Sequence, residues 1–375
     1  MNLFICHRPY HVLVSSHIIS TYHSTVDDNS CVMVDIPIFD KELSPGGRIT
    51  FREIFSSQRG KRKYSQYSGL FKLDGMFHSV HKISRTNEVR IWDIINFVSF
   101  YQSYVKASMK FLERNYSAIE NVYIYSDREK QIEILASLAK EKYSANIILV
   151  DEGIASYYKK GSLLKDIMKR VLTQLFSFKY ISASMEYGES GINDKFMTFD
   201  NIKAKPGTEF IQLPNLNPAK YRHIFSEKTP EVAENTALFI TNALSEGNVL
   251  TIADEKLLIT LIINEILSLG YSVIVKAHPV EISNKYSYLK NLNNVTIIEN
   301  SYLPVEYYYS NEKISFICGI TSSALLNAKR NDLHVVSFIK YLSDNQPVVS
   351  TYSRYEIFMP QNIIDLSEHV SKFNN

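Results

Sequence analysis

The stretch VIVKAHPVE, from Val273 to Glu281, begins as an apolar strand and ends abruptly in a polar turn. Its continuous run of β-branched residues is typical of a strand that is buried on both faces of a parallel sheet. His278 and Pro279 follow where that strand ends. One explanation is ordinary, since a polar cap followed by proline often starts a helix. The other is that His278 faces a ligand at the carboxyl edge of the sheet.

Apolar segments of strand length alternate with helical segments in both halves of the chain. In the first half, we expect strands at 2–6, 31–36, 121–125 and 146–150, and helices ending near 22, starting near 90 and starting near 128. In the second half, we expect strands at 237–241, 271–277, 294–299, 313–318 and 334–339, and a helix over 255–269. This alternation predicts an α/β fold with two doubly wound parallel sheets.

The length of the chain also predicts two domains. A single core rarely grows beyond about 250–300 residues, and this chain has 375. We place the domains at 1–230 and 231–375, divided within the linker-like stretch SEKTPEVAENT at 226–236. The polar stretch at 41–75 has no clear pattern, and we interpret it as an insertion.

Composition excludes several classes of protein. The net charge of +2 gives no reason to expect nucleic-acid binding. Cys6, Cys31 and Cys318 are spaced for neither a zinc site nor a disulfide framework. No apolar run reaches the about 18 residues of a membrane span, and Met1 leads directly into a strand, so we expect a cytoplasmic protein. No Asp-x-Asp, Gly-x-Gly-x-x-Gly or P-loop motif is present, which argues against metal-clamped, dinucleotide and P-loop enzymes.

Three polar loops follow apolar strands at the edge where doubly wound sheets bind ligands. They are Asp151-Glu152-Gly153, His278-Pro279, and Gly319-Ile320-Thr321-Ser322-Ser323, which opens a helix. Each alone is weak, because turns and helix caps have the same composition. The three in this order, divided between two sheets, indicate a ligand site.

This set of motifs resembles that of the bacterial sialyltransferases of the GT-B type. Those families have an acidic D/E-D/E-G motif in the N-terminal domain, then an HP motif and a paired Ser/Thr motif in the C-terminal domain. The lipooligosaccharide and capsule sialyltransferase groups also open with a short strand and an aromatic, polar loop like ICHRPYH at 5–11. The resemblance implies two Rossmann-like domains that face each other across a cleft. It also implies inverting, metal-independent transfer from CMP-sialic acid.

The resemblance further assigns roles to residues. It implies that Glu152 is the general base, that His278 meets the leaving phosphate, and that Glu306 in LPVEYYY binds the ribose. Asp151 stands beside the base as a third catalytic candidate. The remaining donor-side candidates are Lys276, Pro279, Gly319, Thr321, Ser322, Ser323, Thr241 and Asn242. The acceptor-side candidates are His7, Tyr10, His11 and Gly153. For His7 and His11, and for the loop from Thr241, a purely structural role is the open alternative.

The chemistry of a CMP-activated sugar calls for the same residue types. Negative charge grows on the phosphate of the departing CMP while the sugar gains oxocarbenium character. His278 can hydrogen-bond or protonate that phosphate. The hydroxyls of Ser322 and Ser323, with N–H groups at their helix start, can bind an anion. Glu152 can accept the proton of the acceptor hydroxyl, and Asp151 beside it can strengthen its basicity.

The segment after the acidic motif, at 156–180, has the pattern of a basic amphipathic helix. Its apolar face is formed by Leu164, Ile167, Met168, Val171 and Leu175, and its basic residues are Lys165, Lys169 and Arg170. Three interpretations are open: packing against the core, contact with anionic lipid, and a homodimer contact.

We therefore expect a sialyltransferase that works without a cofactor or metal in capsule, lipopolysaccharide or O-antigen assembly. Its partners would be CMP-sialic acid and a lipid-linked glycan with a galactosyl hydroxyl as acceptor. We expect the protein to meet this acceptor at the cytoplasmic face of the inner membrane. Two alternatives stay open. One is transfer of another CMP-linked 2-keto sugar acid, such as Kdo, legionaminic or pseudaminic acid. The other is a non-catalytic nucleotide-sugar-binding protein.

Overall fold

The chain folds into two compact units. The computed structural model describes residues 1–23, 28–34, 77–83, 94–127, 129–151, 167, 171, 173–175, 178–182, 187–200, 208–224, 231–247, 249–278, 281, 284–298, 303–342 and 347–373. Of these, unit 1 takes the residues up to Leu216 and unit 2 those from Asn217. This division precedes the expected boundary at residue 230, because the 3-10 helix η4 (Pro218–Ile224) contacts η6 (Val305–Tyr308) of unit 2.

Unit 1 is built on a parallel sheet. Its seven described strands are β1 (Asn2–Cys6), β2 (Asn29–Val34), β3 (Ser79–Ile83), β4 (Asn121–Ile124), β5 (Asn146–Val150), β6 (Lys195–Thr198) and β7 (Glu209–Gln212). They are ordered β3-β2-β1-β4-β5-β6-β7, and every pair is parallel. The four strands expected from the sequence are β1, β2, β4 and β5, whereas β3, β6 and β7 were not expected.

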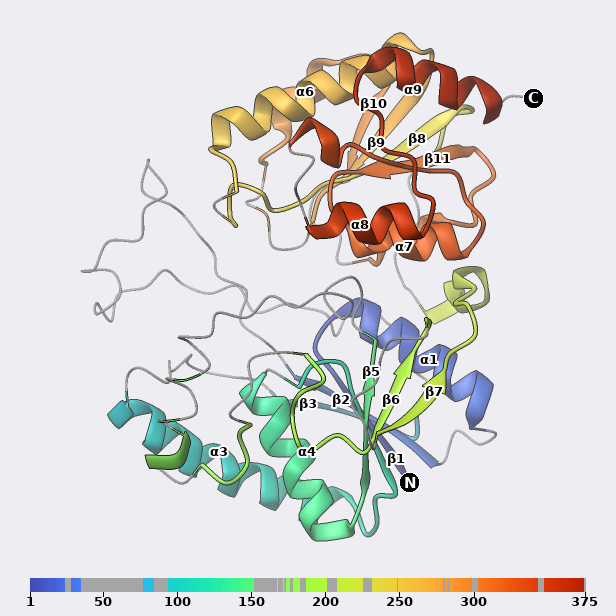
Figure 1. Cartoon of the computed structure of the whole chain (residues 1–375). Coiled ribbons are helices and arrows are strands. Elements are labelled where there is room, and N and C mark those ends of the chain that lie inside the picture. Colours follow the sequence, from blue (N-terminus) through green and yellow to red (C-terminus); the bar gives the residue numbers. More distant parts are fainter. Residues whose placement is uncertain are drawn as a thin grey trace. The chain divides into compact units, whose positions relative to one another are not determined.

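Helices cover both faces of the unit 1 sheet (Figure 1). The described helices are α1 (Pro9–Tyr22), α3 (Ile94–Asn115) and α4 (Lys130–Tyr143). Alternate side chains of β1 point to opposite faces of the sheet. Leu3 and Ile5 belong to the core cluster that includes Leu112 of α3 and Leu135 of α4. Cys6 faces α1 instead, where its Sγ lies 3.3 Å from Ser15 Oγ.

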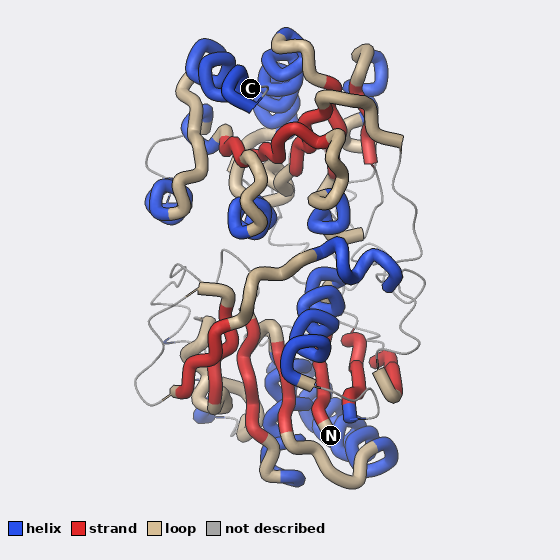
Figure 2. Tube along the Cα trace, turned by 90° about the vertical axis from the view of Figure 1, so that its right-hand side faces the viewer, coloured by secondary structure: helices blue, strands red, loops and turns tan. Residues whose placement is uncertain are grey.

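Unit 2 has a second parallel sheet. Its five described strands are β8 (Thr236–Ile240), β9 (Ser272–Lys276), β10 (Val295–Ile298), β11 (Ile314–Gly319) and β12 (Val335–Ser337), in the order β10-β9-β8-β11-β12. The helices are α6 (Ile252–Ser268), α7 (Ser323–Arg330), α8 (Pro347–Arg354) and α9 (Ile363–Val370), with short 3-10 helices η5 (Ser287–Asn291), η7 (Ile339–Tyr341) and η8 (Ser371–Phe373). Figure 1 shows α6 and α9 on one face and α7 and α8 on the other, and Figure 2 shows the strands between the two helix layers.

Both sheets contain a point where the strand order reverses. In unit 1 it lies between β1 and β4, and in unit 2 between β8 and β11. Doubly wound sheets bind ligands outside the carboxyl ends of the strands at such a point. The expectation of two doubly wound parallel sheets is confirmed, and the loops that follow these strands are where a site is to be sought.

Candidate functional site

The central strands of unit 2 bring the expected donor-side loops together. β8 lies between β9 and β11, and all three strands are parallel, so their carboxyl ends meet at one edge of the sheet. Thr241 follows β8, His278 follows β9, and Thr321 follows β11. Residues far apart in the sequence thus meet at the point where the strand order reverses.

A reciprocal pair of hydrogen bonds joins the loops after β8 and β11. The N–H of Thr321 donates to Asn242 Oδ1 (3.0 Å), and Asn242 Nδ2 donates to the carbonyl oxygen of Thr321 (3.1 Å). Gly319 permits this close approach, because a Cβ at that position would lie 2.6 Å from the carbonyl oxygen of Ile240. The glycine of this motif is therefore required by the spacing of two backbones.

The paired serines lie at the start of α7. Ser322 is the N-cap residue, and its Oγ accepts a hydrogen bond from the N–H of Ala324 (3.3 Å). The hydroxyl of Tyr352 donates to the carbonyl oxygen of Ser322 (2.9 Å). Ser323 is the first residue of the helix, and both serines are half-buried. Ser322 thus has the ordinary capping role, and the helix it caps places the positive end of its dipole at the edge of the sheet.

His278 is exposed, but the backbone that carries it is firmly held. Its N–H donates to both Thr241 Oγ1 (2.9 Å) and Glu281 Oε2 (2.7 Å). The hydroxyl of Thr241, which is fully buried, donates in turn to the same oxygen of Glu281. The N–H of Glu281 closes the turn by donating to the carbonyl oxygen of His278 (3.0 Å). These bonds fix the backbone position of His278, from which its imidazole extends.

Two buried charged residues, Lys276 and Glu306, complete the described donor-side set. Lys276 ends β9, and Glu306 lies on η6, where its Oε1 accepts a hydrogen bond from Asn327 Nδ2 of α7 (2.9 Å). Burial raises the pKa of Glu306, while the bond from Asn327 and the charge of Lys276 oppose that rise. Glu306 is thereby tied to the helix that Ser322 caps. Its contact with a ribose stays a prediction.

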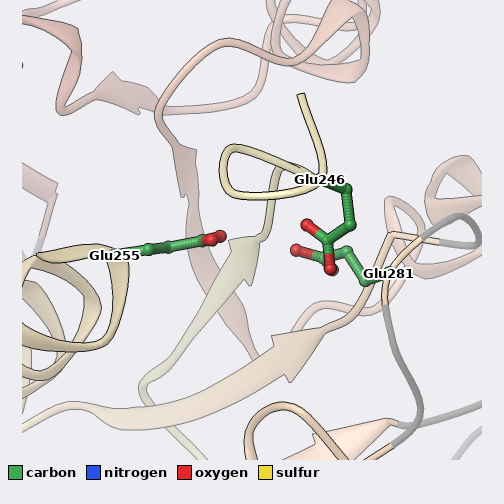
Figure 3. Close-up of side chains that lie close together, drawn as sticks. All are labelled: Glu246, Glu255 and Glu281. Carbon is green, nitrogen blue, oxygen red and sulfur yellow. The ribbon is translucent and has the colours of Figure 1, made fainter. Parts of the chain in front are cut away.

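A buried cluster of three carboxylates adjoins the His278 turn and was not found from the sequence. Figure 3 shows the side chains of Glu246, Glu255 and Glu281 with their carboxylates toward one another. Lys285 Nζ donates to all three, at 2.8 Å, 2.7 Å and 3.2 Å respectively. Because an ammonium group has three N–H donors, each carboxylate can receive one. Lys285 therefore supplies a cation that offsets part of the negative charge of the three carboxylates.

The charges within this cluster are unequal, since three acids share one ammonium group. Burial raises the pKa of Glu281, and Lys285 and the surrounding hydrogen bonds only partly oppose the rise. For Lys285, burial lowers the pKa, but the charge of Glu281 and the hydrogen bonds to Glu246 and Glu255 outweigh it, so the pKa is raised. The lysine is accordingly held in its charged form. The four-residue spacing of Glu281 and Lys285 was the only local signal of this pair.

Three of the four expected acceptor-side residues, His7, Tyr10 and His11, lie just after β1. The N–H of His7 donates to His11 Nδ1 (3.3 Å), and the ring of His11 stacks on that of Tyr125 with centroids 4.3 Å apart. Burial, with the charges of His7 and Arg8, holds the pKa of His11 well below its ordinary value. His11 is therefore neutral, and its proton lies on Nε2 because Nδ1 accepts. Tyr10 is half-buried at the start of the same helix, α1.

The acidic motif is described only at its first residue. Asp151 is fully buried directly after β5, and its N–H donates to the carbonyl oxygen of Met197 (2.9 Å). Glu152, Gly153 and Pro279 lie outside the described residues, so their roles stay predictions.

A second acid of unit 1, Asp127, was missed by the sequence analysis. Its carboxylate accepts hydrogen bonds from the N–H groups of Gly188 and Ser190 and from Asn193 Nδ2. Burial raises the pKa of Asp127, and these three donors oppose the rise. The bonds give Asp127 a structural role, because they fasten the segment that precedes β6 to the end of β4.

The segment expected to form a basic amphipathic helix is only partly described. Leu164, Met168, Lys165, Lys169 and Arg170 lie outside the described residues. Ile167, Val171 and Leu175 of the expected apolar face are exposed, at 49%, 47% and 71%. Their exposure argues against the core-packing interpretation of this face. In the part of the chain that the structure describes, no helix combines the length and hydrophobicity required to cross a bilayer.

Solved structures with the same architecture include a sialyltransferase and nucleotide-sugar enzymes. The S. aureus protein MnaA, solved with UDP, is 10% identical over 100% of this chain and 87% of its own, with a TM-score of 0.54. The UDP-GlcNAc 2-epimerase of Methanocaldococcus jannaschii is 12% identical over 100% and 93%, with a TM-score of 0.51. The α-2,3-sialyltransferase of Photobacterium phosphoreum is 12% identical over 97% and 98%, also with a TM-score of 0.51. At these identities the likeness shows the fold alone, which is of the GT-B type.

The sequence itself identifies the family. No curated protein matches the chain. A family model described as alpha-2,8-polysialyltransferase matches residues 2–332, a span that contains all three sequence motifs. The resemblance to sialyltransferases is thus confirmed, and the chain belongs to the alpha-2,8-polysialyltransferase family.

Proposed function

We propose that this protein is an inverting, metal-independent sialyltransferase that uses CMP-sialic acid as its donor. The observation that carries the proposal is the meeting of three loops at the strand-order reversal of unit 2. These loops carry His278, the Thr241-Asn242 pair and the Thr321-Ser322 pair. They occur in a chain that belongs to a sialyltransferase family.

The donor side suits a phosphate that gains charge as it leaves. His278 is exposed at the edge of the sheet, where its imidazole can donate a hydrogen bond or a proton to the phosphate. The start of α7, with Ser322 and Ser323, offers N–H groups, hydroxyls and a positive helix end to the same anion. These groups can stabilise the charge without a divalent ion.

The proposed reaction is a single displacement. The acceptor hydroxyl attacks the anomeric carbon, a new C–O bond forms there, and the bond from that carbon to the phosphate oxygen of CMP breaks. Glu152 takes the hydroxyl proton, and the leaving phosphate receives a hydrogen bond or proton from His278. One displacement inverts the anomeric centre, so no covalent sugar–enzyme intermediate is formed.

The description of the family bears on the identity of the acceptor. A galactosyl hydroxyl was expected from the resemblance, whereas the family is described by α-2,8-polysialyl transfer. We therefore propose that the acceptor is a glycan that already ends in sialic acid, extended through α-2,8 linkages. A galactosyl acceptor is the alternative. In either case we propose a lipid-linked surface glycan at the cytoplasmic face of the inner membrane.

The test is an acceptor and donor panel with the purified protein. CMP-sialic acid is incubated with an α-2,8-linked sialyl oligosaccharide, with a galactosyl oligosaccharide and without acceptor, and CMP release and product length are measured. CMP-Kdo serves as the comparison donor. We expect CMP release and longer products with the sialyl acceptor, and a loss of about 10²–10⁴-fold in His278→Ala. Release from CMP-Kdo alone would identify another donor. Binding of CMP-sialic acid without turnover on any acceptor would identify a non-catalytic protein.

A further inference from the structure

The two carboxylate oxygens of Glu281 contact different groups. Oε2 accepts the N–H of His278 at 2.7 Å and the hydroxyl of Thr241. Oε1 accepts the ammonium of Lys285 at 3.2 Å and the hydroxyl of Tyr286. One oxygen therefore holds the turn that carries His278, while the other is fastened to the interior of unit 2. A glutamate three residues after a turn residue whose N–H it accepts makes the same contact as the glutamate of a helix capping box.

Lys285 extends this attachment to two further segments. Its other N–H groups bind Glu246, in the loop after β8, and Glu255, in the first turn of α6. Glu255 in turn accepts the N–H of Ser245 at 2.9 Å. The lysine and the three acids are nearly buried, with side-chain exposures of 9% or less. The ammonium group of Lys285 thus contacts the loop after β8, the start of α6 and the segment after β9, and it adds to the direct bonds of Ser245 with Glu255 and of Thr241 with Glu281.

We infer that Glu281, anchored by Lys285, is a positioning residue that sets the placement of the His278 imidazole. This inference rests on the proposed function, in which His278 meets the leaving phosphate. Glu281 does not itself contact the reacting atoms; it acts through the backbone N–H of His278 and through Thr241. The turn fixes the backbone from which the His278 imidazole extends, since the N–H of His278 donates to both Thr241 and Glu281. A displacement of about 1 Å at such a group costs on the order of 10²-fold in rate.

The alternative for this cluster is that it only stabilises the fold. The chain offers a matched control, because Glu255 binds the same ammonium at 2.7 Å and is equally buried, yet its second oxygen holds Ser245 and not the His278 turn. Glu281→Gln and Glu255→Gln remove the same charge from the same cluster. A stabilising role alone predicts equal effects of the two changes, whereas the positioning role predicts a loss of rate in Glu281→Gln only.

The first experiment compares these variants kinetically with CMP-sialic acid as donor. We expect Glu281→Gln to lower kcat by about 10²-fold with little change in donor KM, and Glu255→Gln to lower it far less. In the His278→Ala background, Glu281→Gln should cause no further loss, because the group that it positions is gone. Equal losses in the two glutamine variants, or an undiminished effect of Glu281→Gln in the His278→Ala background, would overturn the inference.

A second pair of variants covers the case in which Glu281→Gln does not fold. Thr241→Val keeps the shape of the side chain but removes the hydroxyl that accepts the His278 N–H and donates to Glu281. Thr241→Ser keeps the hydroxyl and is the matched control. We expect the loss of kcat in the valine variant and its recovery in the serine variant. Equal rates in the two variants would contradict the role of this turn.

An amide measurement separates the inference from the proposed function. The chain has ten histidines, so protein labelled with ¹⁵N-histidine gives few amide signals, and His278→Gln identifies the one from residue 278. In Glu281→Gln we expect this amide signal to shift and its hydrogen exchange to accelerate, while in Glu255→Gln it stays in place. An unchanged signal overturns the inference even if the enzyme is active. A shifted signal in a protein that turns over no CMP-sugar supports the positioning and refutes the proposed function instead.

Discussion

Asn242 and Thr321 exchange two hydrogen bonds across the ends of β8 and β11, so that one asparagine side chain continues the ladder between two parallel strands. The amide is suited to this place because it offers a donor and an acceptor at once. A carboxylate offers only acceptors and would face the carbonyl oxygen of Thr321.

The first prediction follows from this pair. Asn242→Asp should lower the stability of unit 2 by about 1 kcal/mol, because it removes the donor to the half-buried carbonyl group of Thr321. It should also raise the KM for CMP-sialic acid, because the loops move apart and a negative charge is added near the phosphate site. Urea unfolding and donor titration measure the two effects. The same change at the exposed Asn293 is the control, and equal effects at both positions would contradict the role of the pair.

The second prediction concerns the general base. Glu152→Gln keeps the shape of the side chain but cannot accept a proton, so transfer should collapse while CMP-sialic acid still binds. Calorimetry of donor binding and the rate of CMP release measure the two quantities in the same preparation. Abolished donor binding with an intact residual rate would make Glu152 a donor ligand. In that case the base would have to be sought elsewhere.

The third prediction concerns pH. The pKa of Glu306 is raised by burial in the folded protein. An acid whose pKa is higher in the folded than in the unfolded state stabilises the fold fully below its unfolded pKa of about 4.3. This contribution is lost as the pH rises through the pKa of the folded state. The free energy of unfolding of the wild type, relative to Glu306→Gln, should therefore fall as the pH rises from about 4 towards neutrality. Urea unfolding at a series of pH values measures the difference, with Glu368→Gln at an exposed position as control. A difference that grows with pH would contradict the prediction.

The fourth prediction concerns metals. His278, the serine pair and the start of α7 are proposed to stabilise the leaving phosphate, and Lys285 supplies the cation within the carboxylate cluster. Activity should therefore persist in excess EDTA, as measured by CMP release. A complete loss that Mg²⁺ restores would place the enzyme among metal-clamped glycosyltransferases.

The fifth prediction concerns the segment after the acidic motif, which we propose contacts anionic lipid. Each lysine or arginine near such a surface contributes about 1 kcal/mol, so replacing Lys165, Lys169 and Arg170 by Gln should shift partitioning by about two orders of magnitude. Sedimentation with phosphatidylserine vesicles measures this shift. Transfer to a soluble acceptor should stay unchanged.

The control for this variant carries the same loss of charge elsewhere, at the exposed Lys220, Lys290 and Lys372. Equal vesicle binding by the wild type and the 165/169/170 variant would contradict the proposed contact with the membrane. The exposed Ile167, Val171 and Leu175 would then indicate a contact between copies of the chain.

Much of the fold could be predicted because its central strands are apolar and continuous. The segments NLFIC (β1), NIILV (β5) and ISFICG (β11) are recognisable without any tertiary information. The strands that escaped prediction, β3, β6 and β7, are short and mix polar with apolar residues, as in SVHKI and EFIQ. Pairing with a neighbouring strand makes these segments strands, and their own pattern does not reveal it.

The candidate site could be predicted where each residue directly follows a strand. His278, Thr241 and Thr321 each follow an apolar strand, and the structure has all three at one edge of the unit 2 sheet, while their roles stay predictions. The carboxylate cluster could not be predicted, because Glu246, Glu255 and Glu281 come from three separate segments and are brought together by tertiary contacts such as those of Lys285. Their spacing along the chain follows no repeat of a helix or a strand.

The close approach at Gly319 has a consequence for attempts to redesign this enzyme. Any side chain there would meet the carbonyl oxygen of Ile240, so it would push β11 away from β8 and move Thr321 and Ser322 together. The distance between the ends of β8 and β11 is thus set by the contact of their backbones, and a substitution at Gly319 cannot change it in small steps. Libraries intended to change the sugar preference should keep Gly319 and randomise the loop residues around it, since those can vary while the two strands keep their distance.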